Sequence, residues 1–205
     1  MITLEPLRPE RYAEAGALVA RAFMNDPAFL YICPDDPELR YRQSAWMNER
    51  WARVLGPLGA CEISQGGEGV AMWVPPSASP DPSLWTQIRT GLIWAPLHYR
   101  PRQASRGLRL LADLTARHRA MECPHWELNI LCVDPSVQRS GVGSVLVRYG
   151  LDRADRDDSP AYVITHNPAN VAYYTRFGFE VVQQRSAETD RFFACTLMRR
   201  PGGRT

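Results

Sequence analysis

Two glycines that follow a strand-like apolar run give this sequence its clearest chemical signal. The run covers residues 126–133, and a loop over residues 138–143 leads from it into an amphipathic stretch. Gly141 and Gly143 place no side chain against the backbone, so successive N–H groups can point at an anion. The partial positive charge of the following helix N-terminus attracts the same anion. The pattern predicts a cradle for a pyrophosphate group.

The loop does not fit two familiar nucleotide-binding patterns. A P-loop requires Lys and then Ser or Thr after its last glycine, whereas Ser144 and Val145 stand there. A dinucleotide fingerprint requires a third glycine, and Leu146 occupies that position. Two glycines also occur in tight turns that bind nothing, so the surrounding sequence must decide whether this loop binds an anion.

The surrounding sequence resembles a known enzyme family in two separate places. From Val133 to Gly143 the chain reads V-x-P and then Q-x-x-G-x-G, which resembles motif A of the GNAT superfamily of acetyl-CoA-dependent N-acetyltransferases. Residues 170–179, N-V-A-Y-Y-T-R-F-G-F, resemble motif B of that family. The strong resemblance covers residues 124–198, and the first 123 residues match only in general layout.

Within the family, the layout is similar to the puromycin N-acetyltransferase branch. In that branch P-x-W precedes the core strand, as Pro124 and Trp126 do here. An N-x-x-N-x-x-x-Y run follows the fifth strand, and an earlier strand resembles residues 69–74. This similarity suggests an amine-bearing antibiotic or metabolite as the acceptor, by analogy alone.

The resemblance implies the α/β GNAT fold, and hydrophobic periodicity agrees with it. We expect one domain over residues 1–205: a mixed, mostly antiparallel twisted sheet of about seven strands, with helices on both faces and a helical insertion before the core strand. The insertion covers residues 75–121 and a mobile tail covers 199–205. In this fold the core strand and its parallel neighbour separate at a bulge, and the gap holds the cofactor.

The expected elements follow from apolar spacing and from Gly and Pro positions. Strands are predicted over residues 2–6, 60–65, 70–74, 126–133, 161–165, 179–184 and 191–198. Helices are predicted over residues 9–24, 38–55, 84–97, 103–121, 143–156 and 169–177. A turn-rich link is predicted over residues 25–37. The helix over residues 143–156 is expected to bury Val142, Val145, Leu146 and Tyr149.

Amide formation from a thioester requires a deprotonated amine, a polarised carbonyl and a proton for the thiolate. Glu127 lies where some family members carry a general base, and strand alternation places it on the face of Asn129 and Leu131. A carboxylate that only holds a cation is the alternative for Glu127. By resemblance, Tyr174 donates a proton or hydrogen bond to the coenzyme sulfur, with simple packing as its alternative.

The resemblance implies that acetyl-CoA contacts the core strand, the loop and the helix of motif B. The backbone N–H near Leu131 or Cys132 would polarise the carbonyl, and Arg139 would support a phosphate. Tyr173 fits a packing role equally well. No metal site is predicted. The expected acetyl-CoA contacts are Leu131, Cys132, Val133, Gln138, Arg139, Ser140, Gly141, Val142, Gly143, Ser144, Asn170 and Tyr173.

The acceptor pocket is weakly specified by the sequence. Three histidines offer alternative bases, although a lone histidine is usually structural or solvated; they are His98, His118 and His125. Several residues of the first helices and the insertion are possible wall residues, although most aromatics at helical spacing are core. These residues are Phe23, Asp26, Tyr31, Trp46, Trp85 and Trp94.

Composition narrows the class of protein. The 24 basic and 22 acidic side chains give a net charge of +2, which does not favour nucleic acid. The five cysteines show no C-x-x-C or zinc-ligand spacing, so neither a disulfide framework nor a metal site is expected. Charged residues near the N-terminus argue against a signal peptide, and the uncharged runs are too short for a membrane span. We expect a cytoplasmic monomer or homodimer.

These observations predict an enzyme that moves an acetyl group from acetyl-CoA to a primary amine of a small molecule, by direct attack in a ternary complex. One alternative is acetylation of a protein N-terminus or lysine. A second alternative, from another class, is a sensor that binds acyl-CoA without turnover.

Overall fold

The computed structural model describes residues 2–79, 81–121, 123–185 and 193–202. At its centre lies a seven-stranded sheet with the strand order β1-β2-β3-β4-β5-β7-β6. Among the described strands, β4 and β5 form the one parallel pair, so the predicted mixed and mostly antiparallel sheet is confirmed. The strands are β1 Leu4–Pro6, β2 Cys61–Ser64, β3 Gly69–Val74, β4 Trp126–Val133, β5 Ala161–Thr165, β6 Glu180–Arg185 and β7 Ala194–Arg199.

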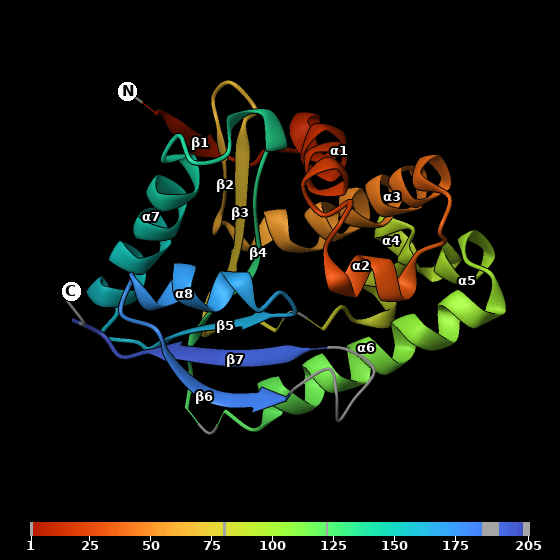
Figure 1. Cartoon of the computed structure of the whole chain (residues 1–205). Helices are drawn as coiled ribbons and strands as arrows, with labels where there is room; N and C mark the ends of the chain where they lie inside the picture. The colour runs from red at the N-terminus through yellow and green to blue at the C-terminus, as the bar shows by residue number, and fades with distance from the viewer. Residues whose placement is uncertain (1, 80, 122, 186–192, 203–205) are drawn as a thin grey trace.

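Helices cover both faces of the sheet (Figure 1). One face is covered by α7 and α8, and the other by α1, α3 and α6. None of the described helices combines the length and apolar composition that a bilayer crossing requires. The helices are α1 Tyr12–Ala22, α2 Pro27–Ile32, α3 Pro37–Leu55, α4 Leu84–Thr90, α5 Ala95–His98, α6 Pro101–Arg119, α7 Val142–Arg156 and α8 Ala169–Thr175, with short 3-10 turns at Pro9–Arg11, Gly56–Leu58, Leu92–Trp94 and Pro135–Val137.

Two expectations about helices are wrong. The predicted link at 25–37 contains α2, which begins because Asp26 accepts a hydrogen bond from the Ala28 N–H at 2.9 Å and Pro27 fits the first turn. The predicted helix at 84–97 is interrupted because Gly91 adopts a φ of 80°, which ends α4.

Two further expectations are wrong at single residues of the C-terminal half. Tyr149 is 44% exposed, because the inward face of α7 continues instead through residues 146, 147 and 150. Arg199 does not belong to a tail: it ends β7, is 5% exposed, and binds Asp155 through two hydrogen bonds of 2.7 and 2.9 Å. Residues 203–205 of the predicted tail, like residues 191–192 of the last predicted strand, lie outside the described residues.

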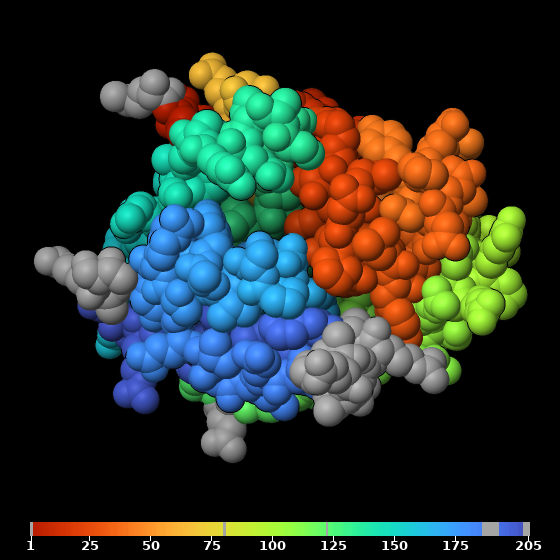
Figure 2. Space-filling view, viewed as in Figure 1, coloured from red at the N-terminus to blue at the C-terminus, as the bar shows by residue number. Residues whose placement is uncertain are grey.

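Strands β4 and β5 stop pairing halfway along β4. Parallel pairing joins only residues 126–128 of β4 to residues 161–163 of β5. On the other side of β4, Met72 pairs with Ile130 and Trp73 with Leu128, so Asn129 is an extra residue in a β-bulge. The predicted separation of the strands at a bulge is therefore confirmed. Figure 2 shows the resulting hollow, between the start of α7, α8 and the α1–α2 region, with the green atoms of β4 at its floor.

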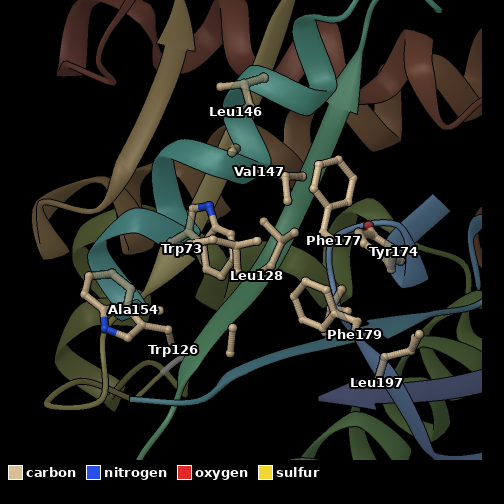
Figure 3. Close-up of a cluster of buried hydrophobic side chains, with 14 of the residues drawn as sticks. Trp73, Trp126, Leu128, Leu146, Val147, Ala154, Tyr174, Phe177, Phe179 and Leu197 are labelled. Atoms are coloured by element: carbon tan, nitrogen blue, oxygen red, sulfur yellow. The ribbon is translucent and has the colours of Figure 1, made fainter. Parts of the chain in front are cut away.

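The core beneath α7 fixes the position of this hollow. In Figure 3 the inner side of α7 lies over Trp73, Trp126 and Leu128, while Tyr174 and Phe177 complete the same apolar cluster from the side of α8. Gly150 lets α7 approach the sheet, because a Cβ at this position would overlap the indole ring of Trp73. The helix that carries the candidate cradle is thus positioned by a tight contact with β3.

We predict that Gly150→Ala lowers the free energy of unfolding by about 1–3 kcal/mol, as expected for overpacking against the buried Trp73 ring. The matched control is Gly107→Ala in α6, where the new Cβ would lie 3.9 Å from Ile32 Cγ2, an ordinary contact. The control should gain up to about 1 kcal/mol from better helix propensity. Urea denaturation of both variants measures this difference. Equal stability of the two variants would contradict the close packing of α7 on β3.

Candidate functional site

Beyond the bulge, one edge of β4 carries main-chain groups that none of the described strands pairs with. The Asp134 N–H donates to Glu68 O at 2.7 Å, toward the β3 side. Strand alternation therefore turns the N–H and C=O groups of Cys132 toward β3, and those of Leu131 and Val133 toward the hollow. Of the three strand positions predicted to contact a ligand, Leu131 and Val133 can pair with an extended chain there, whereas the backbone of Cys132 faces β3.

The thiol of Cys132 is not a nucleophile at neutral pH. Its side chain is 4% exposed and packs in the cluster beneath α1 and α3. Burial raises the pKa of this thiol to about 12, so it stays protonated.

The loop after β4 presents a set of N–H groups at the top of the hollow. Gly141 adopts a φ of 95° and is the N-cap of α7, with no side-chain cap among the described residues. The first-turn N–H groups of Val142, Gly143 and Ser144 have no acceptor within the helix. Together with the positive end of α7, these groups form the geometry of an anion cradle.

Glycine is needed at the two cradle positions for different physical reasons. Gly141 has a φ of 95°, a left-handed conformation that residues with a Cβ rarely adopt. Space is not the constraint there, because a Cβ would meet nothing within 4 Å. At Gly143 a Cβ would lie 2.9 Å from Tyr173 Oη and 3.3 Å from Val133 Cγ2. The first glycine thus sets the turn, and the second admits the close approach of α8.

The other loop residues lie around this cradle. Arg139 has a φ of 68°, which is uncommon for a residue other than glycine and turns the loop sharply. Gln138 donates from Nε2 to Val133 O at 3.4 Å, at the upper end of the open strand edge. The Gln138 side chain therefore lies where a ligand would pass from the strand edge to the helix terminus. Ser140 donates its N–H to Val137 O at 3.3 Å, inside the loop.

An ion pair to α1 holds the base of the cradle. Asp134 Oδ1 accepts hydrogen bonds from the Ser136 N–H at 3.0 Å and hydroxyl at 2.7 Å, while Oδ2 lies 2.8 Å from an Arg21 guanidinium nitrogen. The bonds from Ser136 and the charge of Arg21 lower the pKa of Asp134 to about 2. Sequence spacing did not point to Arg21, because its partner Asp134 lies 113 residues away along the chain.

Helix α8 places its predicted residues on the lower side of the hollow. Asn170 donates from Nδ2 to Thr165 Oγ1 at 3.3 Å, so its amide ties α8 to β5. Tyr173 and Tyr174 stack edge to face at 5.4 Å between ring centroids. Burial raises the pKa of Tyr174, and the nearby charge of Asp26 raises it as well. Tyr174 therefore keeps its proton at neutral pH, as a proton donor must.

Glu127 lies on the opposite face of the sheet from α8. Its Oε1 accepts from Asn129 Nδ2 at 2.9 Å, and its Oε2 lies 3.0 Å from His118 Nδ1. The expectation that Leu131 shares this face is wrong, because the bulge at Asn129 shifts the alternation by one residue. Leu131 packs instead with the cluster of Trp126 and Leu128.

His118 and His125 join Glu127 at one open cavity. The cavity has a volume of about 380 Å³ and lies between the loop after β3, the end of α6 and the start of β4. The hydrogen bond to Glu127 raises the pKa of His118, whereas burial lowers that of His125. Periodicity did not reveal this grouping, since α6 and β4 meet only through tertiary folding.

The residues predicted to line the acceptor pocket lie in different parts of the structure. Trp85 and Trp94 are 66% and 58% exposed on the insertion, and Trp46 stacks on His98 at 3.8 Å between ring centroids. Asp26 lies close enough to Tyr174 to affect its pKa. Asp26 is therefore linked to the hollow through Tyr174.

Comparison with known proteins agrees with this geometry. Residues 108–179 match the family model described as Acetyltransferase (GNAT) family. The matched segment contains β4, the cradle, α7, β5 and α8, whereas α1 and α2, which border the hollow on its other side, lie outside it.

Several solved structures share the fold over nearly the whole chain. A protein from Corynebacterium glutamicum, described as histone acetyltransferase HPA2 and related acetyltransferase, is 20% identical with a TM-score of 0.65, covering 100% of this chain and 98% of that one. A Drosophila melanogaster polyamine N-acetyltransferase is 14% identical with a TM-score of 0.67, covering 98% and 100%. Arylalkylamine N-acetyltransferase 2 from Aedes aegypti is 12% identical with a TM-score of 0.64, covering 96% and 97%. These likenesses establish the fold.

Proposed function

We propose that this chain moves an acetyl group from acetyl-CoA to a primary amine of a small molecule, because residues 108–179 match the GNAT family model and the chain shares the fold of solved acetyltransferases. The observation that carries the proposal is the open edge of β4 beyond Asn129, which leads to the cradle at Gly141. A thioester carrier can lay its amide-containing arm along that edge and its pyrophosphate on the N–H groups at the start of α7.

The unpaired main-chain groups also supply a means of polarising the thioester. The N–H of Leu131 faces the hollow, as the strand alternation fixed by Asp134 requires. A fixed N–H donor stabilises the negative charge that develops on a carbonyl oxygen under attack. The Leu131 N–H is therefore our candidate for this role, and no metal is needed for it.

Tyr174 is our candidate for the proton donor to the departing thiolate. It is buried at 6% exposure on α8, at the side of the hollow, and burial raises its pKa. A phenol that stays protonated can donate to the sulfur as negative charge develops there. Asp26, whose carboxylate lies near this phenol, is a candidate for attracting the ammonium group of the acceptor.

Glu127 is our candidate for the proton acceptor from the amine. Its carboxylate sits two residues before the bulge and contacts the bulge residue Asn129. Its second oxygen is held by His118 at 3.0 Å, so a proton taken from the amine can be shared with the imidazole. Because both oxygens are engaged, we assign the transfer to a bridging water.

The acceptor class rests on several analogies. Solved structures with this fold include N-acetyltransferases described as acting on polyamines, agmatine and arylalkylamines. The sequence similarity to the puromycin-modifying branch adds an aminonucleoside to the candidates. We therefore propose a small amine rather than a protein N-terminus or lysine as the acceptor.

A steady-state assay of CoA release tests the proposed function. The panel contains a polyamine, an arylalkylamine, an aminonucleoside and a peptide with a free N-terminus. We expect turnover with at least one small amine and none with the peptide. Turnover of the peptide alone would identify a protein acetyltransferase. Tight acetyl-CoA binding without turnover of any amine would identify a sensor.

We predict that Gly141→Ala weakens CoA binding about tenfold. A left-handed backbone costs a residue with a Cβ about 1–2 kcal/mol, so the loop shifts and misdirects its N–H donors. Calorimetry with CoA gives the dissociation constant. The matched control is Gly59→Ala, which also has a positive φ, 74°, and open space, but lies after the Gly56–Leu58 turn. If both variants bind CoA equally well, the cradle is assigned to the wrong place.

We predict that Tyr174→Phe lowers kcat roughly a hundredfold while CoA affinity stays within about twofold, because general-acid catalysis contributes about 10²- to 10⁴-fold. The variant keeps the buried ring and removes only the hydroxyl. Tyr149→Phe on the exposed side of α7 is the control and should leave both quantities unchanged. A parallel loss of turnover and CoA affinity would make Tyr174 a binding or packing residue.

A further inference from the structure

We propose that His118, His125 and Glu127 form a binding site for a divalent transition-metal ion such as Zn²⁺. The three side chains come from the end of α6, the residue before β4, and β4 itself. One nitrogen or oxygen from each residue lies within 4.8 Å of the corresponding atoms of the other two. Two imidazoles and one carboxylate, with a fourth position left open, are a recurrent ligand set for zinc.

His125 is oriented as metal-bound histidines are. Its Nδ1 lies 2.8 Å from the Cys123 carbonyl oxygen, and since a carbonyl only accepts, Nδ1 carries the proton. Nε2 then has a free lone pair. This atom is buried and has no hydrogen-bond partner among the described residues. A second hydrogen bond from the distal ring nitrogen to a carbonyl is the usual support for a histidine ligand.

The other two ligands are already in contact. His118 Nδ1 lies 3.0 Å from Glu127 Oε2, and Asn129 holds the other carboxylate oxygen at 2.9 Å. Metal–ligand bonds of about 2.0–2.2 Å in a tetrahedral site place neighbouring ligand atoms about 3.4 Å apart. The observed spacing, from 3.0 Å to at most 4.8 Å, needs only small side-chain rotations to reach this value.

An ion pair between His118 and Glu127 accounts for only part of the cluster. It leaves the buried Nε2 of His125 unsatisfied, and an unsatisfied buried polar atom destabilises the folded state. A metal ion would accept the lone pair of that nitrogen and replace the proton shared by the other two residues. The cavity of about 380 Å³ that these residues line leaves room for a fourth ligand, such as water.

Metal binding would have a consequence for acetyl transfer. The ion would occupy Glu127 Oε2, so the carboxylate could no longer accept a proton from an amine. Zn²⁺ would then inhibit turnover. This consequence rests on the proposed function, whereas the site itself does not.

Titration of the untagged full-length protein with Co²⁺ and Zn²⁺, after removal of bound metals with a chelator, tests the site. Visible absorption of tetrahedral Co²⁺ and calorimetry with Zn²⁺ report binding without any acetylation assay. We expect one ion per chain, and at least a tenfold loss of affinity in His125→Gln and in Glu127→Gln. Two controls should bind as the wild type does: His98→Gln, on the stacked pair with Trp46, and Cys123→Ser, on the exposed thiol beside the site.

Three results would overturn the proposal. They are no uptake of either ion at micromolar protein, wild-type affinity in a folded His125→Gln variant, and loss of binding in Cys123→Ser alone. Circular dichroism checks that each variant is folded. Resistance of His125→Gln to inhibition by Zn²⁺ would connect the site to turnover. If no amine is acetylated, the Co²⁺ spectrum still decides whether the site exists.

Discussion

The incomplete pairing between β4 and β5 is the constraint on which the rest of this structure depends. Main-chain N–H and C=O groups must find partners, and a strand that loses its neighbour leaves such groups at an open edge. Here the loss begins at Asn129, the bulge residue, and continues to the end of β4. The open edge is tolerated because it faces a hollow that water or an extended ligand can fill. A fully paired sheet would close that hollow.

The bulge also connects two chemical environments along one strand. Before Asn129, the side chain of Glu127 faces α6 and the histidines. After it, the alternation is shifted by one residue, so Leu131 packs on the side of α7 and α8. From residue 127 to residue 133 the strand extends about 20 Å at the usual rise of about 3.3 Å per residue. The Glu127 carboxylate and the cradle therefore lie near opposite ends of the same strand.

The local parts of the fold and site could be predicted from the sequence, and the tertiary parts could not. The bounds of β4 and β5 and the start of α7 follow from apolar runs ended by Pro and Gly. Tyr149 was misplaced because periodicity cannot tell which edge of an apolar stripe faces the core. The bulge at Asn129 has no sequence signal, so the predicted face of Leu131 was wrong. Arg21 reaches Asp134, 113 residues away, only through tertiary packing. His118 reaches Glu127 only because the chain reverses between α6 and β4, and no spacing rule describes either contact.

The insertion and the proposed cradle are held by separate sets of contacts. Helix α6 carries His118 to Glu127 and is anchored nearby, where Arg117 donates to Thr196 Oγ1 at 3.0 Å and binds Asp113 at 2.9 Å. The cradle is held instead from the side of α1, by the ion pair between Arg21 and Asp134. Substitutions in the insertion therefore alter the groups around Glu127 while the main-chain donors stay in place. The proposed cradle therefore depends on the glycines that shape its loop, whereas the opposite end of the strand depends on the side chains around Glu127.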